Sequence, residues 1–168
     1  MTRRKIFQSF RYSYDWWRVE TLGQIGSIEG QPLLDRNGWE RVKRNGDAAI
    51  KRWIDGQMRG RSCVVVLIGT ATAGRKWVNY EMKKGWEDGK GVVGVHIHGL
   101  KNSKGKQNTK GPNPLASVSV QTKAGPKLLS KVVKTYDPPF QSSTSVYSHI
   151  KNNIEDWIEE AIAIRKAN

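Results

Sequence analysis

Residues Ser62–Gly69, with the sequence SCVVVLIG, decide the fold class. All six side chains of Cys63–Ile68 are apolar and most are β-branched, which is typical of a strand covered on both faces and hence of a parallel sheet. A helical pattern follows at Trp77–Asp88, and a second apolar strand is predicted at Val92–His98. Strand, helix and strand in this order predict right-handed crossovers in an α/β layered fold.

The chain before this core predicts two further strands and two helices. Lys5–Phe10 is typical of a first strand, and Pro32–Asp35 of a short second strand. Asp47 is a plausible N-cap for a helix that precedes the core. The inner face of that helix would carry Ala49, Ile50, Trp53, Ile54 and Met58. An earlier helix at Asp15–Leu22 would bury Trp16, Trp17, Val19 and Leu22.

The chain after the core changes in composition. Residues 99–127 are rich in Lys, Asn, Gly, Ser and Pro, and we expect them to form a long irregular insertion. Leu128–Tyr136 is expected to form the last strand. Residues 145–165 predict an amphipathic helix whose stripe packs on the core. We expect a single domain over residues 1–168, because the length and the seven tryptophans suffice for one well-filled core.

The sequence carries few signals for targeting or for disulfide formation. The longest apolar run, Cys63–Ile68, is far shorter than the roughly 18 residues of a membrane span. The N-terminal residues Met1–Lys5 carry no apolar segment of a signal peptide. One cysteine excludes an internal disulfide. These features predict a cytoplasmic protein that does not bind membranes.

The charge is strongly positive, +14 at pH 7, and it is unevenly distributed. No acid occurs between Gly89 and Tyr136, a stretch that contains nine lysines. Such a surface attracts polyanions, including nucleic acid and the pyrophosphate of a dinucleotide. The alternative is a solvated face that keeps molecules apart. Nucleic acid is disfavoured as a partner, because no aromatic residues alternate with the lysines in a base-stacking pattern.

Ligands of open parallel sheets bind outside the carboxyl ends of the strands. The residues expected at those ends are Ser9, Phe10, Asp35, Gly69–Gly74 and His98.

Glu81 follows near the start of the helix after the central strand, and a single carboxylate at this place suits one kind of glycosidic bond cleavage. Ordinary glycoside hydrolysis uses two carboxyl groups, one of which protonates a poor leaving group. Nicotinamide leaves NAD as a neutral molecule and needs no general acid, so one carboxylate that faces the developing ribosyl cation suffices. The alternative for Glu81 is a surface acid favoured by the helix dipole.

Other candidates carry weaker signals. Trp77 precedes Glu81 by one turn and is either a wall for a nicotinamide or adenine ring or a core residue. His98 is either a donor or proton carrier at the site, or a structural histidine. His96 and His98 share a strand face, but no third ligand lies nearby, and we expect no metal. The loop Gly69–Gly74 lacks the spacing of phosphate-binding motifs.

Several runs in order resemble a TIR (Toll/interleukin-1 receptor) domain. They are Lys5–Phe10, Leu33–Asp35, Ser62–Gly69, Trp77–Glu81 and Gly91–Ile97. Three more runs resemble the TIR-like proteins of bacterial Thoeris antiphage systems, the ThsB family. These are Tyr14–Arg18, Gly46–Ile54 and His96–Lys101. The resemblance implies a flavodoxin-like, three-layer α/β fold with a central, mostly parallel five-stranded sheet and helices on both faces.

The resemblance also implies an activity and a site. Members of the family break the nicotinamide glycosidic bond of NAD and are thought to cyclise ADP-ribose into a signal for a separate effector protein. NAD is then a substrate, and no prosthetic group is implied. The family's catalytic residues correspond to Glu81 and His98, and its nucleotide-binding residues to Phe7, Ser9, Phe10 and Trp77, with Asp35 added at the predicted second strand end. The alternative is a non-catalytic TIR-type module that associates with itself or with a partner.

Overall fold

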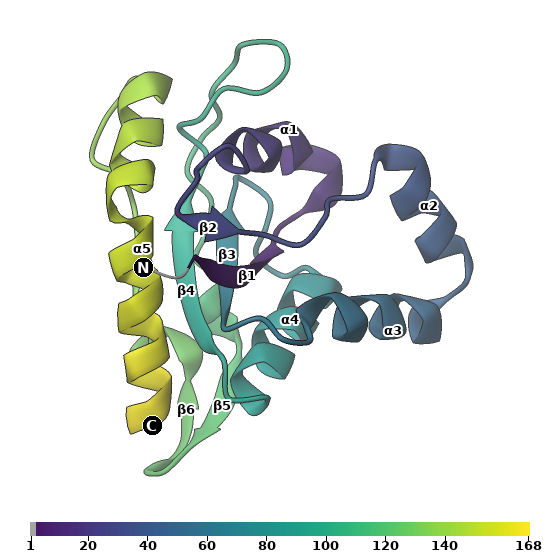
Figure 1. Cartoon of the computed structure of the whole chain (residues 1–168), viewed down its shortest axis with the longest axis vertical. Helices are drawn as coiled ribbons and strands as arrows, with labels where there is room; N and C mark the ends of the chain where they lie inside the picture. The colour runs from purple at the N-terminus through teal and green to yellow at the C-terminus, as the bar shows by residue number, and fades with distance from the viewer. Residues whose placement is uncertain (1–2) are drawn as a thin grey trace.

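The computed structural model of the chain describes residues 3–168. Five parallel strands form the central sheet, in the order β2-β1-β3-β4-β7, and β5 and β6 form a separate antiparallel pair (Figure 1). In chain order the elements are β1 (Arg4–Ser9), α1 (Tyr12–Leu22), β2 (Ile28–Glu29), α2 (Arg36–Arg44), α3 (Asp47–Met58), β3 (Cys63–Ile68), α4 (Lys76–Glu87), β4 (Gly91–His96), β5 (Ser119–Thr122), β6 (Gly125–Leu128), β7 (Thr135–Tyr136) and α5 (Ser143–Ala167).

The central strand β3 is buried along its whole length, as is its neighbour β4. Its side chains alternate between two cores, because successive residues of a strand face opposite sides of the sheet. Cys63, Val65 and Leu67 join one hydrophobic cluster. Val64, Val66 and Ile68 join the other. A strand with no polar face requires cover on both sides, which the helices provide.

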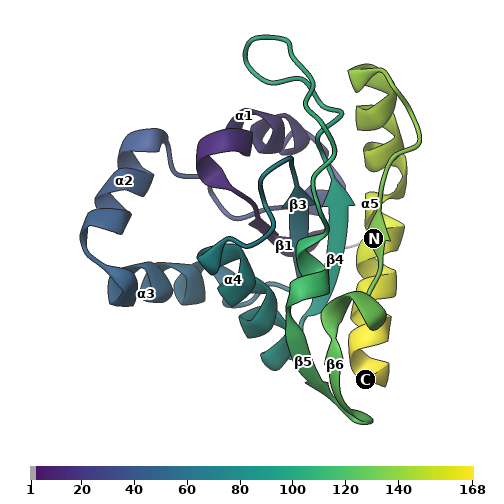
Figure 2. The same cartoon turned by 180° about the vertical axis from the view of Figure 1, so that it is seen from behind.

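The helices form two layers around the sheet. Buried residues of α1 and α5 complete one cluster, and those of α3 and α4 complete the other. Figures 1 and 2 show α5 along one side of the molecule, with α2, α3 and α4 on the opposite side. At Gly85 of α4, an added Cβ would lie 2.4 Å from Val64 Cγ2, so the glycine allows α4 to approach β3 closely. The prediction of a parallel five-stranded sheet between helices is confirmed.

The prediction of the second strand was wrong. β2 is Ile28–Glu29, and Pro32–Asp35 lies outside the sheet. Asp35 is instead the N-cap of α2, where its Oδ1 accepts a hydrogen bond from Gly38 N at 2.6 Å. This cap allows the helix to begin at Arg36, although the Asn37-Gly38 pair that follows is typical of a turn. The sequence analysis therefore missed α2.

The buried face of α1 also differs from the prediction. Val19 and Leu22 are buried as expected, but Trp17 is 48% exposed and Trp16 is half-buried. Asp15 and Arg18 occupy the interior instead, because their side chains form an ion pair there with an N···O distance of 3.0 Å.

The predicted N-cap of the next helix, α3, was wrong as well. Gly46, with φ +87°, is its N-cap, and Asp47 is the first helical residue. The exposed side chain of Asp47 forms an ion pair with Lys76.

The region expected to be an irregular insertion is irregular only as far as Asn113. A 3-10 helix at Pro114–Ser117 and the β5–β6 hairpin follow. In the hairpin Val120 and Thr122 are buried while Ser119 and Gln121 are exposed, a two-residue alternation that the Lys- and Gly-rich composition concealed. The last sheet strand, β7, is confined to the end of the predicted Leu128–Tyr136 segment.

The amphipathic C-terminal helix is present as α5, extended by two residues at each end relative to the prediction of 145–165. None of the helices in the described part of the chain is long and apolar enough to cross a membrane.

Candidate active site

A hollow of about 370 Å³ opens where β1 ends, between the N-termini of α1 and α4. We call it the first hollow. It is lined by Phe7, Gln8, Phe10, Arg11, Tyr12, Ser13, Gln31, Trp39, Lys43, Trp53, Arg75, Lys76, Trp77, Val78 and Glu81. It therefore forms at a carboxyl edge of the sheet, where ligands of parallel sheets bind.

Glu81 is the acid among the lining residues, and it is only 7% exposed. It lies in the second turn of α4, one turn later than a residue that the helix dipole would stabilise strongly. Ser9, the last residue of β1, is fully buried and donates a hydrogen bond from its Oγ to Glu81 Oε1 at 2.7 Å. The alternative of a surface acid is thus contradicted by the structure.

The pKa of Glu81 is raised from 4.5 to about 8. Burial is the main cause, because it penalises the charged form, and the hydrogen bond from Ser9 opposes the rise. At pH 7 the carboxyl group of the free protein is therefore mostly protonated. A cation placed beside it would favour the carboxylate.

Four cationic side chains line the same hollow: Arg11, Lys43, Arg75 and Lys76. Arg11 and Arg75 are also the N-cap residues of α1 and α4, and neither side chain caps its helix by a hydrogen bond. Lys43 pairs with Glu40 at 3.2 Å and Lys76 pairs with Asp47. The positive potential of the first hollow therefore comes mainly from Arg11, Arg75 and the two uncapped helix N-termini, and it suits an anionic ligand.

Aromatic rings form another wall. The rings of Phe10 and Tyr12 stack with centroids 5.0 Å apart, and Tyr12 stacks on Trp39 at 5.1 Å. Trp39 contacts Trp53 at 5.8 Å. The sequence analysis missed Tyr12, Trp39 and Trp53 as site residues. The available signal was the cap at Asp35, which would have predicted α2 and brought Trp39 toward β1.

A family model described as "Thoeris protein ThsB, TIR-like domain" matches residues 7–102 of the chain, more than half of its length. The chain belongs to this ThsB family. The Bacillus cereus (strain MSX-D12) protein named "Putative cyclic ADP-D-ribose synthase ThsB1" is 38% identical over 97 residues, which are 58% of this chain. The aligned part spans half the length of that relative.

The ThsB match encloses every residue that lines the first hollow. Among the residues predicted for the site, Phe7, Phe10, Trp77 and Glu81 line it, and Ser9 bonds to Glu81. These five are therefore brought together. The β5–β6 hairpin, β7 and α5 lie outside the ThsB match.

His98 is not among the residues that line the first hollow. It follows the end of β4, and its ring centroid lies 5.7 Å from that of His96. Burial lowers the pKa of His98. The structure therefore does not pair it with Glu81. Among residues 3–168, no group of three or more His, Cys, Asp and Glu side chains is placed to hold a metal ion.

Asp35 lines a second hollow of about 670 Å³. The second hollow is formed by Tyr12, Ser13, Tyr14, Trp16, Trp17, Asp35, Trp39, Glu40, Asn102 and Ser103. Tyr12, Ser13 and Trp39 belong to both hollows, so the two are adjacent. The first hollow thus has a neighbouring space that the sequence did not predict.

Gln31 fixes the segment after β2 against β1. Its side-chain Oε1 accepts a hydrogen bond from Gln8 N at 2.7 Å, and its Nε2 donates to Gln8 O at 2.9 Å. The buried amide continues the hydrogen bonding of a strand, although Gln31 lies outside the sheet. Because Gln8 precedes Ser9, this contact holds the strand end that positions Glu81 in the ThsB domain.

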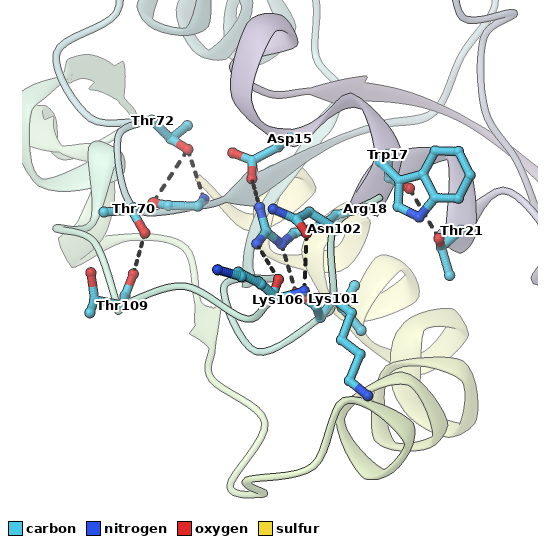
Figure 3. Close-up of polar contacts among 12 residues, drawn as sticks. Asp15, Trp17, Arg18, Thr21, Thr70, Thr72, Lys101, Asn102, Lys106 and Thr109 are labelled. Atoms are coloured by element: carbon cyan, nitrogen blue, oxygen red, sulfur yellow. Dashed lines mark hydrogen bonds and ion pairs between the residues drawn. The ribbon is translucent and has the colours of Figure 1, made fainter. Parts of the chain in front are cut away.

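Arg18 holds the loop after β4 on α1 (Figure 3). Its guanidinium donates to Asp15 Oδ1 at 3.0 Å, to Leu100 O at 2.7 Å and to Lys106 O at 3.0 Å. An added Cβ on Gly69 would lie 2.1 Å from Asp15 Oδ2, so the ion pair lies directly against the end of β3. This cluster fills the sheet edge at the end of β3.

Proposed function

We propose that the chain cleaves the nicotinamide glycosidic bond of NAD in the first hollow. The observation that carries the proposal is the buried carboxyl group of Glu81, held by Ser9 at the wall of a cationic hollow. The bond between ribose C1′ and the pyridinium nitrogen breaks, and its electron pair leaves with neutral nicotinamide. The Glu81 carboxylate stabilises the ribosyl cation that remains.

The ionisation of Glu81 is coupled to the substrate in this proposal. In the free protein its pKa of about 8 favours the neutral acid at pH 7. The pyridinium of NAD and the developing ribosyl cation both carry positive charge, so they lower that pKa and draw the proton away. The carboxylate then stabilises the transition state more than it stabilises the bound substrate, and this difference is what accelerates the reaction.

The cationic lining suits the rest of the substrate. Arg11, Lys43, Arg75 and Lys76 would bind the pyrophosphate, aided by the helix N-termini of α1 and α4. Trp77 and Phe10 offer apolar contact to the nicotinamide ring. No prosthetic group is needed, because the leaving group is already activated in the substrate.

We further propose that the ribosyl cation is captured within the same molecule. A hydroxyl or base nitrogen of the adenosine half bonds to C1′, and a hydroxyl gives its proton to solvent in that step. The name of the Bacillus cereus relative, "Putative cyclic ADP-D-ribose synthase ThsB1", supports this outcome. The cyclic product would act as a diffusible signal to a separate effector protein in Thoeris-type antiphage defence.

The test is nicotinamide release from NAD by the purified chain, followed by chromatography, with mass spectrometry of the second product. Wild type should release nicotinamide. Glu81→Gln should release it at least about 100-fold more slowly, as expected when a group that stabilises the transition state electrostatically is removed. Glu87→Gln, an exposed acid on the same helix, is the matched control and should retain the rate.

Equal rates for wild type and Glu81→Gln would overturn the proposal. So would a folded wild type that releases no nicotinamide, and self-association of such a chain would indicate an assembly module instead. The product decides the finer claim, because cyclic and linear ADP-ribose differ in mass by one water.

A further inference from the structure

We infer that the second hollow binds the adenosine half of the dinucleotide, an inference that rests on the proposed function of the first hollow. Adjacency is the first argument. Tyr12, Ser13 and Trp39 form walls of both hollows, so the two hollows lie side by side. A dinucleotide is the kind of ligand that needs two such neighbouring spaces.

The charge of the two hollows differs in the way that the two halves of the ligand require. The first hollow is lined by four cations, which suit the pyrophosphate. The second is lined by Asp35 and Glu40, and by no cation among the lining side chains that the structure describes. It therefore does not suit a phosphate. Glu40 forms an ion pair with Lys43 at 3.2 Å. Asp35 Oδ1 accepts a hydrogen bond from Gly38 N. Each carboxylate thus has one oxygen in these contacts and offers the other to a ligand. Carboxylates accept hydrogen bonds from ribose hydroxyls or from an exocyclic amino group.

Its aromatic wall suits a planar base. Tyr14 is 58% exposed and Trp17 is 48% exposed, so both rings have surface to offer a ligand. Trp16 is fixed, because its Nε1 donates to Leu34 O at 3.0 Å, and the hydroxyl of Tyr12 donates to the same carbonyl. A purine stacks on such rings with little loss of side-chain freedom.

The far wall is formed by the loop that Arg18 holds. Asn102 and Ser103 line the second hollow, and the guanidinium of Arg18 bonds to carbonyls on both sides of them, at Leu100 and Lys106 (Figure 3). Asn102 Oδ1 accepts from the backbone amides of Lys104 and Lys106. Its Nδ2 remains a donor for a ring nitrogen of the base. The loop is thus a wall of the second hollow that is held in place by hydrogen bonds.

The occupant is a nucleoside in this account, and not a second protein chain. An aromatic groove alone would serve either, but its position beside a cationic hollow and its two carboxylates match adenosine next to a pyrophosphate. Since Trp17 is the most exposed tryptophan of the wall, it is the ring on which we expect the base to stack.

Isothermal titration calorimetry with two probes tests the inference. Adenosine contains the half assigned to the second hollow, and nicotinamide mononucleotide contains the other half. Trp17→Ala should weaken adenosine binding about tenfold, or ~1.4 kcal/mol, and leave nicotinamide mononucleotide unchanged. Trp17→Phe should restore most of the affinity because it keeps a ring. Phe140→Ala, which removes a ring that is 50% exposed and lines neither hollow, is the control.

Three outcomes would overturn the inference. Adenosine could fail to bind wild type, it could bind Trp17→Ala as tightly as wild type, or the substitution could weaken both probes equally. Loss of self-association in Trp17→Ala without loss of adenosine binding would indicate a protein interface. Adenosine binding requires no bond cleavage, so it is expected unchanged in Glu81→Gln. A chain that binds adenosine through Trp17 but releases no nicotinamide would refute the proposed reaction and retain the subsite.

Discussion

Two carboxyl groups are buried at the same edge of the sheet, and the side chains that contact them differ. Asp15 lies against the guanidinium of Arg18, whereas Glu81 contacts the hydroxyl of Ser9. Burial raises the pKa of both groups, but Arg18 opposes the rise at Asp15 with a full charge. A charge-paired acid is fixed as part of the scaffold. An acid held only by a hydroxyl is free to respond to a charged ligand.

The largest effect on stability should come from removing Arg18, the charged partner of Asp15. Arg18→Met removes the partner of a buried carboxylate and the donor to two loop carbonyls, so we expect a loss of about 3–5 kcal/mol in the free energy of unfolding. Denaturant unfolding at pH 7 measures it. The double variant Asp15→Asn, Arg18→Met should recover part of the loss, and a single variant as stable as wild type would contradict the pairing.

Glu81 should behave in the opposite way. Its folded pKa of about 8 lies above its ordinary value of 4.5, so the folded chain keeps a proton that the unfolded chain releases between these pH values. Wild type should therefore lose stability as pH rises from 4.5 to 8, at up to about 1.4 kcal/mol per pH unit.

Glu81→Gln removes this dependence. The variant should become more stable than wild type by a few kcal/mol as pH approaches 8. Unfolding midpoints of both proteins at several pH values provide the comparison, with Glu87→Gln as the exposed control. Parallel stability curves for wild type and Glu81→Gln would show that Glu81 titrates normally.

A smaller change should come from Ser9→Ala. The hydrogen bond from Ser9 favours the charged form of Glu81, so its loss should move the pKa of Glu81 upward. If the carboxylate is the active form, kcat/KM for nicotinamide release, which reports the free enzyme, rises with pH and levels off above about pH 8 in wild type. The profile of Ser9→Ala should be displaced to higher pH, while Ser119→Ala, at an exposed position of β5, keeps the wild-type profile. Superimposed profiles for all three would remove Ser9 from the account.

The sequence predicted those parts of the fold that depend on apolar periodicity. The buried runs of β1, β3 and β4 and the stripe of α5 were found because each pattern is local. The hairpin of β5 and β6 was missed, because its alternation covers only a few residues among lysines and glycines.

The candidate site likewise contains residues that the sequence predicted correctly and residues that it did not. Glu81 and Ser9 follow from the ends of strands that could be predicted, and the helix register then brings them together. Asp35 and His98 were predicted from the rule that strand ends converge, but the path of each loop decides where the side chain lies. The cap at Asp35 is a local contact with Gly38 that the sequence analysis overlooked. The loop fixed by Arg18 depends on contacts between distant residues, which no local pattern encodes.

The rate of nicotinamide release under saturating NAD is the most direct test of the role given to Glu81. At pH 8 the account predicts that Glu81→Gln lowers kcat at least about 100-fold while KM changes only a few-fold, because the carboxylate acts on charge that develops in the transition state. An unchanged kcat, or an effect confined to KM, would contradict it.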